Sequence, residues 1–116
     1  MTRQNVCNGS KVRRVAELND QLRTRLEGGK VMMTSGFAAL EAGIKAQLMQ
    51  AVMTFADFNT DNDPHGERDF CSVEVEGVKA FWKVDYYDTD IRYGSDDPSD
   101  ASKTTRIATY MLAEEY

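Results

Sequence analysis

Two alternating apolar runs joined by Glu76-Gly77 constrain the fold of this chain more than any other feature of its sequence. The dipeptide suits a two-residue hairpin turn, and the turn fixes which residues face each other. In this register one face of the hairpin is apolar and the other carries an opposite-charge pair, so a one-residue slip would spoil both faces. The predicted pairs are Val75–Val78, Val73–Ala80, Cys71–Trp82, Glu74–Lys79 and Phe70–Lys83.

Helical spacing precedes the hairpin. Ser10 is a candidate N-cap for a helix whose apolar stripe is Val15, Leu18, Leu22 and Leu26, with its arginines elsewhere on the helix surface. Gly28-Gly29 ends that helix, because glycine takes the left-handed conformation at little cost.

Three more elements follow from local patterns. Residues 30–34 form a short apolar run that predicts a strand, and residues 41–57 show helical spacing again. Asp97-Pro98 is typical of a helix start, and Thr104, Ile107 and Met111 continue a helical stripe. The sequence therefore predicts an α+β fold in a single small domain over residues 10–116, in the order α-β-α-β-β-α, with helices packed on a central β-hairpin or small antiparallel sheet. Residues 1–9 lack periodicity and are predicted to form a flexible N-terminal arm.

Charge divides the chain into two parts. The net charge is −5, but residues 1–56 carry eight Lys/Arg against four acids, whereas residues 57–100 carry thirteen acids against four Lys/Arg. The acidic middle disfavours phosphate backbones and favours cationic partners. We find no apolar run long enough for a signal peptide or a membrane span, so we expect a cytoplasmic protein that does not bind membranes.

The central residues resemble a known family. The chain is similar to short bacterial proteins catalogued as domain of unknown function 3768 in the motifs Asp61-Asn-Asp-Pro64, Gly66-Glu67, Asp69-Phe70, Trp82-Lys83 and Asp85-Tyr86-Tyr87-Asp88. The resemblance implies a small cytosolic protein of alphaproteobacteria, often encoded on plasmids or other mobile elements, with no established activity. Arg68 and Cys71 stand where the resemblance implies His and Gly. If that His were a catalytic base or a ligand in relatives, this chain would lack it.

Two candidate chemical sites fit the sequence poorly. Asp57, Asn59, Asp61 and Asp63 alternate as in a calcium loop, but the sixth and twelfth positions are not the Gly and Glu that an EF-hand needs. Asp and Asn are more simply explained as residues that turn their own backbone. Cys71 could be a nucleophile, but it falls on the apolar hairpin face, which favours a buried thiol. Its surroundings are also acidic, whereas a reactive cysteine needs electropositive surroundings. We therefore expect no metal and no cofactor.

The favoured hypothesis is a non-enzymatic protein that binds a macromolecular partner, most simply another protein. Its acidic surface would face a basic groove that normally holds nucleic acid, which points to an anti-defence inhibitor of a CRISPR or restriction complex. The candidate contact residues are Asp61, Asp63, Glu67, Asp69, Trp82, Lys83, Asp85, Tyr86, Tyr87, Asp88, Asp90, Tyr93, Asp96 and Asp97.

Two alternatives stay open. A small enzyme or ligand-binding module could use the acidic loop and hairpin over residues 61–85, provided that its polar groups converge in one pocket. These groups are Asp61, Asp63, Glu67, Lys83 and Asp85. A regulator that binds nucleic acid through its basic first helix is disfavoured, because a basic helix is more often a solvated face and this one has no interleaved aromatic residues.

Overall fold

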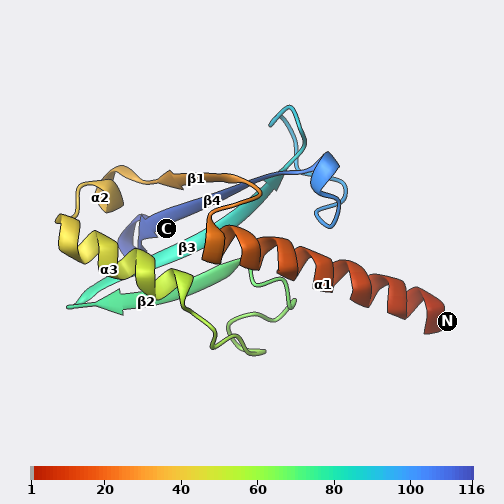
Figure 1. Cartoon of the computed structure of the whole chain (residues 1–116), viewed down its shortest axis with the longest axis horizontal. Helices are drawn as coiled ribbons and strands as arrows, with labels where there is room; N and C mark the ends of the chain where they lie inside the picture. Colours follow the sequence, from red (N-terminus) through yellow and green to blue (C-terminus); the bar gives the residue numbers. More distant parts are fainter. Residues whose placement is uncertain (1) are drawn as a thin grey trace.

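The computed structural model describes the backbone of residues 2–116 and the side chains of residues 9–116. Helices and a four-stranded mixed sheet form one α+β domain, which confirms the predicted fold class (Figure 1). The elements are α1 (Thr2–Arg25), β1 (Lys30–Met33), α2 (Ser35–Ala38), α3 (Ala42–Met53), β2 (Phe70–Val75), β3 (Val78–Tyr87) and β4 (Thr105–Leu112), with single 3-10 turns at Ala101–Lys103 and Ala113–Glu115.

The hairpin has the predicted register. Val75 pairs with Val78, Cys71 with Trp82 and Glu74 with Lys79, and Phe70 lies opposite Lys83. Glu76 and Gly77 both have positive φ values, 50° and 81°, which is the geometry of a type I′ turn. The strand order is β1-β4-β3-β2, with β1 parallel to β4 and the other neighbours antiparallel.

The predicted last helix is wrong, because residues 105–112 form the strand β4. Thr104, Ile107 and Met111 do have helical spacing, but the same segment alternates with period two. Arg106, Ala108 and Tyr110 are buried on one face. Hydrogen bonding to both β1 and β3 makes β4 a central strand, and this pairing overrides the local helical pattern.

The first helix keeps three of the four residues of its predicted apolar stripe but not its predicted start. Val15, Leu18 and Leu22 are buried, whereas Ser10 lies inside a helix that begins at Thr2, so it is not the N-cap. Leu26 is 43% exposed and has φ of 58°, and it ends α1 together with Gly28 at φ 89°. The sequence predicts that residues 1–9 are mobile. The side chains of residues 1–8 lie outside the described part of the chain, so this stays a prediction.

The apolar core lies between the helices and one face of the sheet. Leu48 and Val52 of α3 and Leu22 of α1 pack on that face over Trp82 and its neighbours. The helix predicted over residues 41–57 is shorter, because Glu41 caps its start through Gly43 N at 2.8 Å and it ends at Met53. Over the described residues, no helix is both long enough and apolar enough to cross a membrane.

Candidate functional site

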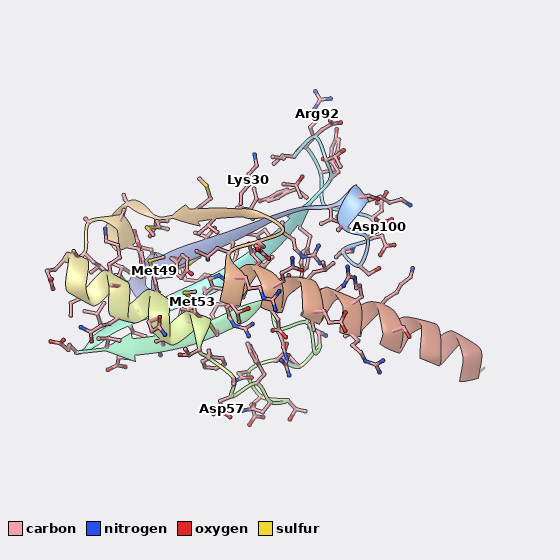
Figure 2. All side chains as sticks on the ribbon, in the orientation of Figure 1. Lys30, Met49, Met53, Asp57, Arg92 and Asp100 are labelled. Carbon is pink, nitrogen blue, oxygen red and sulfur yellow. The ribbon has the colours of Figure 1, made fainter. Side chains whose placement is uncertain are left out.

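Two acidic loops leave the same end of the sheet. One loop spans residues 57–69 and leads into β2, and the other spans residues 88–104 and joins β3 to β4. Phe70 at the start of β2 pairs near the end of β3, and Tyr87 at the end of β3 pairs with Thr105 at the start of β4. Figure 1 shows the loops on either side of α1, and Figure 2 marks them with Asp57 and Arg92.

The loop over residues 57–69 uses its polar side chains to hold its own backbone. Asn59 Oδ1 accepts from the amides of Asp61 at 2.8 Å and Asn62 at 3.1 Å, and Asp63 Oδ1 accepts from the Arg68 amide at 3.0 Å. The interpretation of these residues as turn formers is thus confirmed. Among the described residues, no group of three or more His, Cys, Asp or Glu side chains could hold a metal ion.

The loop over residues 88–104 has the same design. Asp97 Oδ1 accepts from the Ser99 amide and hydroxyl, and Asp100 Oδ1 accepts from those of Ser102. These hydrogen bonds, chiefly those from the serine hydroxyls, lower the pKa of both carboxyls, so both stay ionised at neutral pH. The predicted helix start at Asp97-Pro98 is therefore a capped turn instead.

Exposed apolar side chains lie among these carboxylates. Ile91 is 40% exposed, with φ of 56°, and Tyr93 is 74% exposed. Asp90 and Asp96 on the same loop are also exposed. An aromatic side chain inside a charged rim is the usual arrangement of an interface anchor.

A buried polar network under α1 connects the two loops. Asn19 Nδ2 donates to the Glu67 backbone oxygen at 3.0 Å and to the Tyr86 hydroxyl at 2.8 Å. The Tyr86 hydroxyl donates to the Glu67 carboxylate at 2.9 Å. Arg106 Nε donates to Asn19 Oδ1 at 2.9 Å, and its Nη2 donates to the Pro98 carbonyl. Asn19 thus holds one loop and Arg106 holds the other.

Burial sets the charge states in this network. Asn19 and Arg106 are 0% and 1% exposed. Burial raises the pKa of Tyr86, so its hydroxyl keeps the proton that it donates to Glu67. Burial also lowers the pKa of Arg106, and the neighbouring Tyr86 and Glu67 oppose that shift. Arginine stays protonated in proteins, so the network contains a buried cation.

A second polar group fixes the loop over residues 57–69 to α1. The Asp20 carboxylate accepts from Arg23 Nη1 at 2.8 Å and from Arg68 Nη1 at 3.1 Å. Both guanidinium groups lie over the Phe58 ring, 4.9 Å and 5.2 Å from its centroid. Arg23 is only 3% exposed, which corrects its predicted place on the helix surface. Part of the positive charge of this basic helix is therefore buried inside the molecule.

The structure divides the predicted contact residues into separate groups. Trp82 is 1% exposed and belongs to the core, so its side chain is not available to a partner. Tyr86 is held in the polar network, and Lys83, Asp85 and Tyr87 lie on the sheet face opposite Trp82. The remaining predicted residues lie on the two loops: Asp61, Asp63, Glu67 and Asp69 on the first, and Asp88, Asp90, Tyr93, Asp96 and Asp97 on the second.

The groups named for the enzyme alternative do not share a cleft. A cleft of about 420 Å³ lies between α1 and the first loop, with Val12, Arg13, Gly66 and Arg68 among its lining residues. Asp61, Asp63, Glu67, Lys83 and Asp85 are not part of that lining. Lys83 and Asp85 instead form a 3.3 Å ion pair on the other sheet face. Burial raises the pKa of the Cys71 thiol to about 12, which opposes nucleophilic chemistry there.

Sequence reasoning missed Asn19 and Arg106. Asn19 lies four residues after Val15 and three before Leu22, so helical spacing places it on the buried face of α1. A polar residue on an apolar face was thus a usable signal. Arg106 gave none, because its burial is apparent only when residues 105–112 are known to form a strand.

Comparison with known proteins gives a family whose function is unknown. The family model described as protein of unknown function (DUF3768) matches residues 33–115, which is more than half of the chain. No curated protein and no solved structure shows significant similarity to the chain.

Proposed function

The chain belongs to the DUF3768 family of proteins of unknown function, and from the geometry of its loops we propose that it is a non-enzymatic protein that binds a macromolecular partner. The contact surface is the pair of acidic loops, residues 57–69 and 88–104. The observation that carries the proposal is that one buried network, Asn19 with Arg106, holds both loops at the same end of the sheet. Holding a surface in place before contact lowers the ordering cost of binding.

Charge gives the chemistry of the partner. Asp61, Asp90 and Asp96 are exposed, and their carboxylates make no hydrogen bond or ion pair with described residues. Exposed, unpaired carboxylates on the two loops, which leave the same end of the sheet, favour a basic surface and steer its approach. Ile91 and Tyr93 supply the apolar contact that an interface needs at its centre.

The finer proposal concerns which basic surface is bound. Basic grooves on proteins commonly hold nucleic acid, and two acidic loops separated by a helix can occupy such a groove in place of phosphates. We therefore favour a nucleic-acid-binding complex as the target, and the class to examine first is bacterial defence complexes of the CRISPR or restriction type. The resemblance to proteins of mobile elements supports this choice.

The test is capture of the partner with a matched pair of charge-reversal variants. Tagged protein is purified from a related bacterial host after nuclease treatment, and bound proteins are identified by mass spectrometry. The loop variant carries Asp61→Lys, Asp90→Lys and Asp96→Lys. The control carries Glu27→Lys, Glu76→Lys and Glu114→Lys, three exposed acids outside the loops that change the net charge equally.

We expect a stoichiometric partner with a basic groove that is retained by the wild type and the control and lost by the loop variant. Binding should also weaken steeply with salt. Equal retention by both variants would exclude the loops as the contact surface. Clean eluates without any protein would count against a macromolecular partner altogether.

A further inference from the structure

The sheet has a second face that none of the described helices α1 to α3 covers. Strand residues alternate between faces, and burial follows that alternation: Ala80, Trp82 and Val84 are buried under the helices, whereas the residues between them are only partly buried. The packing of α1 and α3 is on the Trp82 side. The opposite side, which we call the open face, carries Lys30 and Met32 of β1, Phe70, Ser72 and Glu74 of β2, Lys79, Phe81, Lys83, Asp85 and Tyr87 of β3, and Thr105, Ile107, Thr109 and Met111 of β4, of which Met111 is only 6% exposed.

The open face is more apolar than a sheet face turned to water needs to be. Phe70, Phe81 and Tyr116 form an aromatic cluster with ring centroids 5.0 to 5.9 Å apart. Met32 is 52% exposed and Tyr116 is 72% exposed. Antiparallel sheets that face solvent usually present polar side chains on the wet side. Phe70 and Phe81 are half-buried and pack against the exposed Tyr116 ring, and an exposed aromatic cluster of this kind on a folded domain marks an interaction surface.

The charges on the open face point to its occupant. Lys79 lies directly opposite Glu74, and Lys83 pairs with Asp85 at 3.3 Å. Both signs are thus present and nearly balanced, so the face lacks the positive field that nucleic acid requires and the excess of one sign that would steer an oppositely charged protein. A patch with both signs is complementary to itself across a two-fold axis, where the Lys of one copy meets the carboxylate of the other.

From these observations we propose that the open face is the interface between two copies of this chain. The chain carries a net charge of −5, concentrated in its acidic loops, so two copies repel each other over most orientations. The open face is a nearly neutral, apolar surface on which they can meet. Two sheets packed face to face lie about 10 Å apart and interdigitate side chains such as Met32 and Phe81.

The size of the face sets the expected strength. The strands have 4, 6, 10 and 8 residues, and at about 3.3 Å per residue and about 4.8 Å between strands they present roughly 450 Å² on each copy. A total of about 900 Å² lies below the range of stable specific interfaces and within that of weak, transient ones, so we expect a dimer with a dissociation constant in the micromolar range.

Sedimentation-equilibrium ultracentrifugation of the full chain tests the proposal. The interface variant carries Met32→Glu and Tyr116→Glu, which place like charges against each other in a two-fold dimer. The control carries Ile91→Glu and Tyr93→Glu, exposed apolar residues on an acidic loop that change the net charge equally. All four positions are exposed, and circular dichroism checks that each variant folds.

We expect a concentration-dependent dimer for the wild type and the control, and a dissociation constant at least tenfold higher for the interface variant. A wild type that is monomeric up to about 100 µM would overturn the proposal, because a micromolar dimer is populated well below that concentration. Dimers of equal strength in all three proteins would overturn it too, since they would place the interface elsewhere. If a labelled single-stranded RNA were bound by the wild type and not by the interface variant, the occupant of the open face would be nucleic acid and the proposal would be overturned.

Discussion

At one end of the helix-covered sheet face the packing is apolar, and at the other end it is polar. Leu48, Val52 and Phe37 pack over Trp82 and Tyr110 at the first end, with the rings of Phe37 and Tyr110 stacked at 5.3 Å. Towards α1 the same face ends in Tyr86 and Arg106, which pair with each other across β3 and β4 and bond to Asn19. The two ends stabilise the molecule by different means.

This difference separates folding from function. Apolar packing is non-directional, so the first end fixes the layers of the fold without fixing loop positions. Hydrogen bonds are directional, and those of Asn19 and Arg106 terminate on backbone oxygens of the two acidic loops. We infer that the polar end stabilises the fold less than apolar packing would and positions the loops instead.

The largest effect is expected at the apolar end, in the reactivity of Cys71. Its pKa of about 12 lies well above the ordinary value of 9.0, which reduces the thiolate fraction about a thousandfold at about pH 8. In a Cys7→Ser background, a disulfide reagent followed by absorbance should label Cys71 at least a hundredfold more slowly in native protein than in urea-denatured protein. Rapid labelling of the native protein would show that this end opens easily and would contradict the comparison of a firmly packed apolar end with a polar end.

The next prediction compares the two ends directly through Asn19→Ala and Leu48→Ala. Loss of Asn19 removes the partner of Arg106 Nε and one of the two partners of the Tyr86 hydroxyl, inside a buried network that contains a cation. This change should lower the free energy of unfolding by about 3 kcal/mol. Leu48→Ala should cost about 2–5 kcal/mol by leaving a cavity. Urea denaturation measures both values and shows whether the two variants are destabilised to a similar extent.

Hydrogen exchange then distinguishes the two variants. The amides of Arg68 and Asp100 are bonded within the first and second loops, and we expect them to exchange at least tenfold faster in Asn19→Ala than in Leu48→Ala. Equal rates in the two variants would mean that the network adds stability but does not position the loops.

These two ends also differ in how far the sequence predicts them. The hairpin register follows from the turn and two alternating runs, because both signals are local. The strand β4 does not, since Thr104, Ile107 and Met111 mimic a helical stripe and only pairing with β1 and β3 decides the outcome. The acidic composition of both loops is plain in the sequence, but their common location is not. It depends on the strand order and on Arg106, whose burial requires β4 to exist.

A smaller effect is expected from Tyr86→Phe. This change removes only the hydroxyl between Asn19 and Glu67 and keeps the ring, which lies 5.2 Å from the Arg106 guanidinium. The free energy of unfolding should fall by about 1 kcal/mol in urea denaturation. Tyr93→Phe is the control, because Tyr93 is 74% exposed and should change stability by less than about 0.5 kcal/mol. A similar value for both variants would show that the Tyr86 hydroxyl adds nothing to the polar end.

The smallest effect concerns Glu115, which lies outside both compared regions and serves as their reference. Its carboxylate accepts from the Thr34 hydroxyl at 2.5 Å, from Leu112 N at 2.9 Å and from Gly36 N at 3.0 Å. These bonds, led by that from Thr34, hold the pKa of Glu115 below its ordinary value of 4.5. The stability that they supply is present above the pKa of the unfolded state and is lost as pH falls through the lower pKa of the folded state.

Glu115→Gln should therefore be less stable than wild type at neutral pH, and the two should converge under acid conditions where the wild-type carboxyl is protonated. Urea midpoints measured across that pH range test the convergence, while Glu114→Gln, an exposed neighbour, should follow the wild type throughout. Because the Glu115 bonds touch neither loop, the Arg68 and Asp100 amides should exchange at wild-type rates in Glu115→Gln once its small global destabilisation is matched with urea. Faster exchange there would mean that loop placement responds to any loss of stability, and the special role of the polar end would fail.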